Sequence, residues 1–156
     1  MKKILISSCL AGEKVRYNGS DRKINHPLIN KWDKEGRLIL ACPEILGGLS
    51  TPRPSAEIIN GSGLDALNKH SKITDINHND LTKEFIDGAE KTLEIIKEHN
   101  IDIAIMAERS PSCGSCKIYD GTFSGKLIHG EGVTTALLRK NGVTIYNENQ
   151  LDDIKE

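Results

Sequence analysis

Short apolar segments alternate with amphipathic segments along most of this chain. The clearest amphipathic segment is 82–99, where Phe85, Ala89, Leu93 and Ile96 recur at helical spacing and Lys and Glu fill the opposite face. Apolar runs of strand length lie at 3–7, 37–41, 101–106 and 143–146. Strands separated by helices predict an α/β fold, here a three-layer, Rossmann-like and mostly parallel sheet.

Turn and capping residues bound the other predicted helices. Asn25 or His26 caps a helix that has Pro27 in its first turn and ends at Gly36. A shorter helix at 133–140 is closed by an Asn-Gly pair, and 149–155 predicts the start of a final helix.

Two segments lack a regular pattern. In 45–81, two prolines exclude regular structure near residue 53, while 56–59 and 69–76 predict short strands with a turn at 60–63. The segment 108–132 is rich in Gly and Ser yet keeps apolar residues, which predicts a loop ordered over a site. Because no repeat or linker divides the chain, residues 1–156 are expected to form a single domain, with the segment 45–81 as a loop-rich flap.

Composition excludes several functional classes. With 21 Lys and Arg against 22 Asp and Glu, the net charge is -1, which gives no field for a nucleic-acid polymer or a membrane surface. No apolar run approaches the roughly 20 residues of a transmembrane helix. The N-terminal apolar run stops at Ser7, too early for a secretory signal, so the sequence predicts a cytoplasmic protein whose four cysteines are reduced.

Three of the cysteines occupy equivalent positions. Cys9, Cys42 and Cys113 each follow the C-terminal end of a predicted strand, directly or after a short loop. In a parallel sheet these ends lie along one edge, where α/β proteins bind ligands, so three thiols could converge there. The plain alternative is that they are unrelated small buried residues.

Cys116 forms a C-x-x-C pair with Cys113. Alone, this pair indicates a redox dithiol or half of a zinc site, although the next residues, 117–121, do not favour the helix that a thioredoxin-type pair needs. Four thiolates would suffice for a closed zinc or iron–sulfur site. Three would leave open the coordination position that metal-centred catalysis requires.

The chain also contains several multi-residue motifs in a fixed order. They are Ser7-Ser8-Cys9-Leu10, Arg16-Tyr17-Asn18-Gly19, Cys42-Pro43-Glu44, Gly47-Gly48-Leu49, Thr51-Pro52-Arg53-Pro54, Ser110-Pro111-Ser112-Cys113-Gly114, Tyr119-Asp120-Gly121-Thr122-Phe123-Ser124-Gly125 and Gly132-Val133-Thr134. Over nearly its whole length the chain thereby resembles the bacterial family, long catalogued as a domain of unknown function, that includes [4Fe–4S]-dependent thiouracil desulfidases.

This resemblance implies a [4Fe–4S] cluster held by Cys9, Cys42 and Cys113, with the fourth iron free for substrate sulfur. Zinc is the alternative metal. The sequence departs from the family pattern at two positions. Val15 stands where relatives often have a cysteine, and Cys116 stands where they often have another residue, so Cys116 is expected to be a bystander or a spare ligand.

The implied activity is hydrolytic, non-redox removal of sulfur from a thiocarbonyl of a thiolated nucleobase or similar small molecule. By resemblance, Glu44 would deprotonate a water or relay a proton, and Ser110 would position the water or the substrate. From the residues alone, Glu44 could equally be a solvated or capping carboxylate, Ser110 a turn residue, and Arg53 the structural partner of a carboxylate.

Two other functional classes remain open at this point. The first is a non-catalytic protein that binds zinc or an iron–sulfur cluster through all four thiols. The second is a thiol redox or sulfur-relay protein that uses Cys113 and Cys116.

Overall fold

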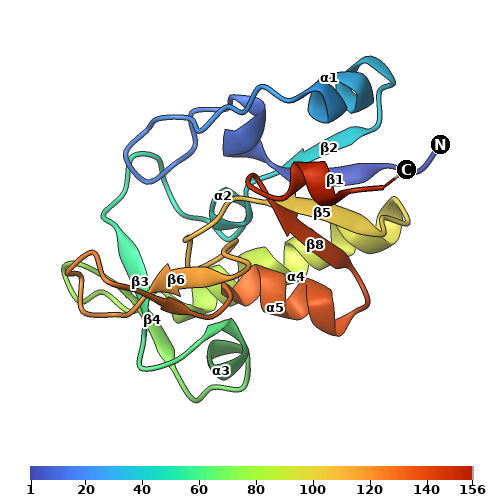
Figure 1. Ribbon diagram of the computed structural model, residues 1–156. Coiled ribbons are helices and arrows are strands. Elements are labelled where there is room, and N and C mark those ends of the chain that lie inside the picture. The colour runs from blue at the N-terminus through green and yellow to red at the C-terminus, as the bar shows by residue number, and fades with distance from the viewer. Residues whose placement is uncertain (156) are drawn as a thin grey trace.

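A central sheet of four strands organises the computed structural model, which describes residues 1–155 (Figure 1). The strands are β1 (Ile4–Ser7), β2 (Leu38–Ala41), β5 (Ile103–Met106) and β8 (Thr144–Asn147). They lie in the order β2-β1-β5-β8, and every neighbouring pair is parallel. The four apolar runs therefore form the parallel sheet that their pattern predicts.

Helices cover both faces of this sheet. Figure 1 shows α1 (Pro27–Lys34) above the sheet, and α4 (Thr82–Glu98) beside α5 (Val133–Lys140) below it. The Nδ1 atom of His26 accepts the backbone N–H of Leu28 at 3.1 Å, and Pro27 occupies the first turn, as the sequence predicts for the start of α1. The three-layer α/β prediction is confirmed.

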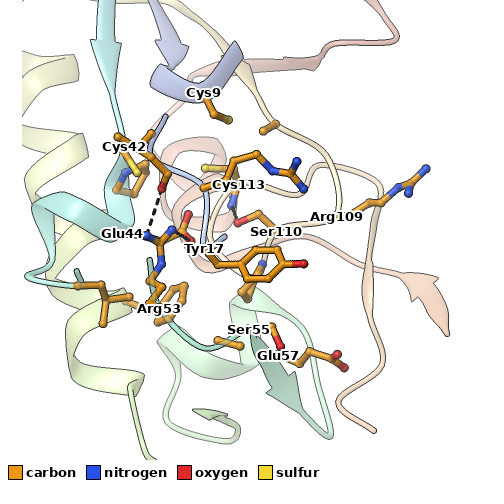
Figure 2. Close-up of a pocket in the computed structure, with 18 of the residues that line it drawn as sticks. Cys9, Tyr17, Cys42, Glu44, Arg53, Ser55, Glu57, Arg109, Ser110 and Cys113 are labelled. Carbon is orange, nitrogen blue, oxygen red and sulfur yellow. Dashed lines mark hydrogen bonds and ion pairs between the residues drawn. The ribbon is translucent and has the colours of Figure 1, made fainter. Parts of the chain in front are cut away.

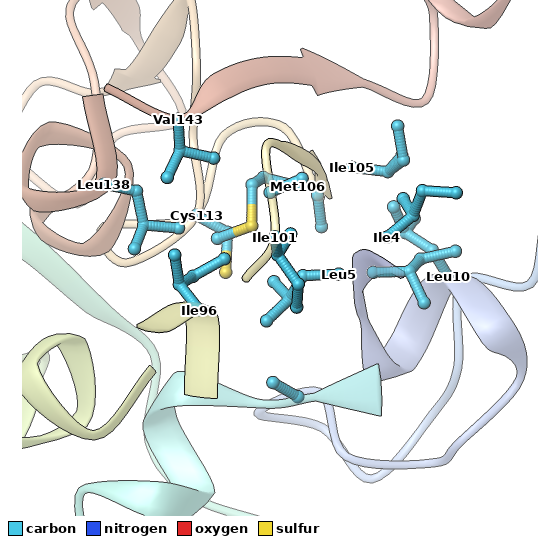
Figure 3. Packing of buried hydrophobic residues seen from close by; sticks show 14 of the residues in the cluster. Ile4, Leu5, Leu10, Ile96, Ile101, Ile105, Met106, Cys113, Leu138 and Val143 are labelled. Atoms are coloured by element: carbon cyan, nitrogen blue, oxygen red, sulfur yellow. The ribbon is translucent and has the colours of Figure 1, made fainter. Parts of the chain in front are cut away.

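Two hydrophobic clusters stabilise the molecule, and α4 contributes to both. Ile96 packs into the first cluster, which surrounds the central sheet and also holds Leu5, Met106 and Cys113 (Figure 3). Phe85, one turn from the start of α4, belongs to the second cluster, which lies under the flap. Because the flap shares α4 with the main core, it is packed and ordered rather than an open loop.

The flap contains more regular structure than the sequence pattern predicts. Its strands β3 (Ala56–Ile59) and β4 (Lys72–Asp75) pair antiparallel, as expected. The predicted turn at 60–63 is wrong in part, because it leads into the helix α3 (Gly63–Leu67), which begins with a capping box formed by Ser62 and Asp65.

Two further expectations need correction, and one short helix was not predicted. The predicted loop 108–132 contains a hairpin of β6 (Lys117–Tyr119) and β7 (Leu127–His129). The predicted final helix is only a 3₁₀ turn, η2 (Leu151–Asp153). A four-residue helix, α2 (Pro43–Leu46), starts directly after Cys42, with Pro43 at its first position. Within the described part of the chain, no helix combines the length and hydrophobicity of a membrane span.

Helix α2 packs against α4 through two glycines. A Cβ atom on Gly47 would overlap the carbonyl oxygen of Glu84, and one on Gly88 would overlap the carbonyl oxygen of Pro43. The backbones of the two helices are therefore in direct contact. This contact fixes α2, and with it Cys42 and Glu44, against the longest helix of the fold.

Gly88→Ala is expected to lower the free energy of unfolding by about 1–3 kcal/mol, because the added methyl group must push α2 away from α4. An exposed helical glycine would respond with the opposite sign, since alanine has the higher helix propensity by about 1 kcal/mol. Urea unfolding of the metal-free protein measures the change. An unchanged or increased stability would show that the two backbones are not in contact.

Candidate functional site

A cavity of about 330 Å³ opens at the C-terminal ends of β1, β2 and β5, between the sheet and the flap (Figure 2). The chain leaves β1 toward β2 on one side and later returns to β5 on the other, so the cavity lies at the topological switch point of the sheet. The lining residues come from segments 7–9, 15–22, 41–57, 76–85, 107–113 and 119–125.

The structure brings Cys9, Cys42 and Cys113 together at this cavity. Cys9 lies in η1 (Ser8–Ala11) after β1, Cys42 is the N-cap residue of α2, and Cys113 follows β5. Figure 2 shows the three side chains gathered at one end of the cavity with Glu44 beside them. After burial, which is the largest cause, the negative charge of Glu44 also raises the pKa of all three thiols.

All three thiols have a raised pKa in the metal-free protein, mainly because burial disfavours the charged thiolate. The pKa of Cys9 rises to about 11, although Arg22 and Arg16 partly oppose the increase. At neutral pH the three groups are therefore neutral thiols. Any metal that binds to them must displace their protons.

This environment predicts that the reduced, metal-free protein loses stability in alkali. The folded pKa of Cys9 is raised from 9.0 to about 11, so its stabilising contribution is complete below pH 9.0 and is lost as the pH rises toward 11. The loss is on the order of 2 kcal/mol from Cys9 alone. Urea unfolding at a series of pH values measures it, and Cys9→Ser should make the profile less steep, with the remaining slope due to Cys42 and Cys113. The same steep profile in Cys9→Ser would contradict the assignment.

The donor set suits a polynuclear cluster. In residues 1–155, no three His, Cys, Asp or Glu side chains lie close enough together to hold one metal ion. The thiols of Cys9, Cys42 and Cys113 instead line one cavity. Ligands of a single zinc must all reach one point at about 2.3 Å, whereas each thiolate of an iron–sulfur cluster binds a different iron.

Hydrogen-bond donors approach two of these sulfurs. The backbone N–H groups of Glu44 and Ile45, at the start of α2, oppose the effect of burial on the pKa of Cys42. The Sγ atom of Cys113 lies 3.8 Å from Oγ of Ser112. The nearby hydroxyl of Ser7, which donates to Sδ of Met106 at 3.9 Å, opposes the effect of burial on the pKa of Cys113. Both sulfurs therefore have donors that would stabilise a metal-bound thiolate.

Arg53 holds Glu44 in the cavity wall. Its Nη2 donates to Oε2 of Glu44 at 2.8 Å, and the side chains are only 7% and 16% exposed. Its Nη1 donates to the carbonyl oxygens of Val15 and Ser50 and to Oγ1 of Thr51, each at 3.1 Å. Arg53 thus has the structural role expected for it. Among the described residues, Oε1 of Glu44 has no hydrogen-bond partner.

Ser110 both shapes the cysteine loop and lines the cavity. Its Oγ accepts the backbone N–H groups of Ser112 at 3.0 Å and Cys113 at 3.1 Å. Because both lone pairs are engaged, its hydroxyl proton is the group still free to interact with a ligand. Ser110 can therefore donate a hydrogen bond into the cavity but is a poor proton acceptor.

The N-terminus of α5 supports the same loop. The N–H groups of Val133 and Thr134 donate to the carbonyl oxygens of Pro111 and Ser112 at 2.8 and 2.9 Å. A Cβ atom on Gly132 would overlap the backbone of Ser112, so only glycine allows this approach. The first-turn amides of α5 are thus satisfied by the segment that carries Cys113.

Other residues of the sequence motifs either line the cavity or stabilise a turn outside it. Arg16 and Tyr17 line the cavity, and the guanidinium of Arg16 lies 6.0 Å from the Tyr17 ring centre. Asp120 instead accepts the N–H and the hydroxyl of Thr122 in its own turn. Phe123 of the 119–125 motif lines the cavity, as does Glu57, which sequence reasoning did not single out.

Cys116 lies apart from the three clustered thiols. Its side chain is exposed and does not contribute to the cavity lining, and all four cysteines are free thiols. Its sulfur neighbours are Ser115, Asn147 and Gln150, at 3.6 to 4.0 Å. The C-x-x-C spacing thus places one thiol in the site and the other on the surface.

The carboxylate of Glu108 also holds the loop that carries Cys113. Burial alone would raise the pKa of Glu108, but hydrogen bonds from the backbone amides of Cys116, Ser115, Lys117 and Arg109 outweigh it and lower the pKa. This buried carboxylate was not anticipated. The only sequence signal is an acidic residue close to the end of a buried strand.

Fold and site together define a Rossmann-like α/β protein with a pocket of three thiols at its switch point. The profile of the family described as 2-thiouracil desulfurase matches residues 4–150. The chain therefore belongs to the 2-thiouracil desulfurase family.

Individual relatives agree with this membership. The chain is 51% identical over 151 residues to the uncharacterized protein YbbK of Bacillus subtilis (strain 168), and the match covers 97% of this chain and 99% of that protein. It also matches the solved structure of the [4Fe-4S]-dependent thiouracil desulfidase TudS (DUF523Vcz), with 40% identity and a TM-score of 0.89. That match covers 98% of this chain and 95% of the TudS chain.

Proposed function

We propose that this protein is a [4Fe–4S]-dependent desulfidase that removes sulfur hydrolytically from the thiocarbonyl of a thiolated nucleobase or similar small molecule. The observation that carries this proposal is the convergence of Cys9, Cys42 and Cys113, from three strand ends, on one cavity. The similarity to TudS supports the cofactor and the class of substrate.

The proposed ligands are the thiolates of Cys9, Cys42 and Cys113. When bound, a [4Fe–4S] cluster with only three protein ligands would supply one open iron, a Lewis acid that can polarise a substrate C=S group. The cavity of about 330 Å³ is within the range of small-molecule sites. Its aromatic side chains, Tyr17, Phe85, Tyr119 and Phe123, suit a planar heterocycle.

Glu44 is the proposed proton acceptor. Its Oε2 is held by Arg53 at 2.8 Å, while Oε1 is without a hydrogen-bond partner in residues 1–155 and can bind a water. By accepting a proton from that water, Glu44 would generate the nucleophile that attacks the thiocarbonyl carbon. Arg53 would keep the carboxylate oriented during this transfer.

Ser110 is proposed to orient the reacting groups by donating its hydroxyl proton, since its lone pairs accept two backbone amides. The water oxygen forms the new C=O bond, the C–S bond breaks, and sulfur leaves as hydrosulfide. Water supplies the oxygen of the product and the protons that balance the departing sulfide. The substrate carbon and sulfur keep their oxidation states, so the reaction needs no electron donor or acceptor.

A screen of thiolated bases and nucleosides with anaerobically reconstituted protein tests this function. We expect sulfide and the oxo product in a one-to-one ratio, without added reductant, and incorporation of ¹⁸O from labelled water into the product. Metal-free protein should be inactive. If fully loaded protein released no sulfide from any of these compounds, the proposed activity would be wrong.

A further inference from the structure

Glu108 makes an unusually complete set of hydrogen bonds beside the site. Glu108 is only 8% exposed, and its carboxylate accepts six hydrogen bonds. The donors to Oε1 are the backbone N–H groups of Arg109 (3.2 Å), Ser115 (2.7 Å), Cys116 (3.1 Å) and Lys117 (3.3 Å). The donors to Oε2 are Nδ2 of Asn147 (2.7 Å) and Oγ of Ser115 (3.2 Å).

These bonds close the loop that carries Cys113. Glu108 precedes Cys113, and the amides of residues 115–117 follow it, so one carboxylate fastens both ends of the intervening segment. Asn147 belongs to β8, the neighbour of β5, and joins the loop to the sheet. The N-terminus of α5 holds the same segment through Pro111 and Ser112.

The carboxylate itself binds no cation through its side chain among residues 1–155. Only its backbone carbonyl receives a basic group, Nη1 of Arg22 at 2.8 Å. Its charge is thus compensated entirely by amide and hydroxyl donors, which are directional. A charge held this way fixes the geometry of its donors more closely than a flexible lysine partner would.

We propose that Glu108 is a positioning residue for cluster binding, which holds Cys113 and Ser110 in place by closing the 108–117 loop. This inference rests on the proposed role of Cys113 as a ligand. Glu108 contributes to the cavity lining, but both of its carboxylate oxygens are engaged by the loop and by Asn147, so it acts through the loop rather than as a ligand. Its loss should therefore weaken retention of the cluster rather than remove a ligand.

Glu108→Gln is the primary test. The glutamine oxygen can accept the backbone amides, but its NH₂ group then opposes the NH₂ of Asn147, and a buried donor loses its acceptor. We expect cluster loss to a chelator, followed by visible absorption, to accelerate on the order of tenfold. Adding Asn147→Asp restores a donor–acceptor pair with the introduced glutamine and keeps the net charge, so the double variant should regain slow loss.

Asp65→Asn is the matched control for general destabilisation. Asp65 also accepts a backbone N–H, from Ser62 at 2.8 Å, but it caps α3 and lies outside the cavity lining. Its replacement should lower the midpoint of thermal unfolding without accelerating cluster loss. If Asp65→Asn released the cluster as fast as Glu108→Gln, cluster loss would report only lower stability, and the proposal would fail.

The remaining outcomes are also decisive. Wild-type retention in Glu108→Gln, or absence of rescue by Asn147→Asp, would overturn the positioning role. If Glu108→Gln did not fold, Asn147→Ala, which removes one donor, should still accelerate cluster loss severalfold, and unchanged loss would overturn the proposal. Cys113→Ser in the same assay separates the positioning role of Glu108 from the ligand role of Cys113. Full retention of the cluster in this variant would refute the ligand role itself.

Discussion

Serine in place of Cys9, Cys42 or Cys113, one at a time, should abolish stable binding of the [4Fe–4S] cluster, whereas Cys116→Ser should leave it intact. Each of the first three removes one of only three cysteine side chains that line the cavity among the described residues, and a hydroxyl is a poor ligand for a soft metal site. The Cys116 thiol is exposed and outside the cavity lining. Iron and acid-labile sulfide per chain, measured after anaerobic reconstitution, distinguish the two groups.

Cys116→Ser is also the matched control, since it removes a thiol that lies outside the site. Loss of the cluster in this variant would favour a closed four-thiolate site and the non-catalytic alternative. Loss of sulfide release with the cluster retained would favour a sulfur relay through Cys116. The three-ligand proposal requires that neither occurs.

Glu44→Gln should retain the cluster and reduce kcat by about 10²–10⁴-fold, the usual contribution of a general base. Glutamine preserves the side-chain volume and can still accept the hydrogen bond of Arg53, which now measures 2.8 Å to Oε2. It cannot take a proton from water. Steady-state sulfide release by protein of equal iron content measures the effect.

Asp120→Asn is the control for loss of a carboxylate from a nearby motif. The Asp120 side chain accepts hydrogen bonds from Thr122 in its own turn and does not line the cavity, so kcat should be unchanged. A Glu44→Gln variant with wild-type kcat would show that another group accepts the proton. Glu44 would then be a structural partner of Arg53.

The sequence predicts the central sheet well because its strands are short apolar runs separated by helices. Local patterns such as His26-Pro27 also place helix ends correctly, since capping depends on neighbouring residues. Helix α3 was missed although its capping box, Ser62 and Asp65, is local. The β6–β7 hairpin was missed because strands of only three residues leave too little periodicity to detect.

In the candidate site, too, the residues that follow predicted strands could be identified from the sequence, whereas those that depend on long-range contacts could not. The position of Cys9, Cys42 and Cys113 after strands predicts a common edge, because parallel strands end together. The contact of Glu44 with Arg53 was foreseen only as a general pairing. Glu108 could not be identified, since its partners are backbone amides and Asn147, 39 residues away, which only the folded sheet brings together.

The most direct test of the central claim is electron paramagnetic resonance of the fully loaded, reduced protein with and without 2-thiouracil. If three thiolates leave one iron open to substrate sulfur, the spectrum changes on addition of 2-thiouracil and not on addition of uracil. Cys116→Ser should behave in the same way. An unchanged spectrum at saturating 2-thiouracil, in protein whose cluster is fully assembled, would contradict an open, substrate-binding iron at this site.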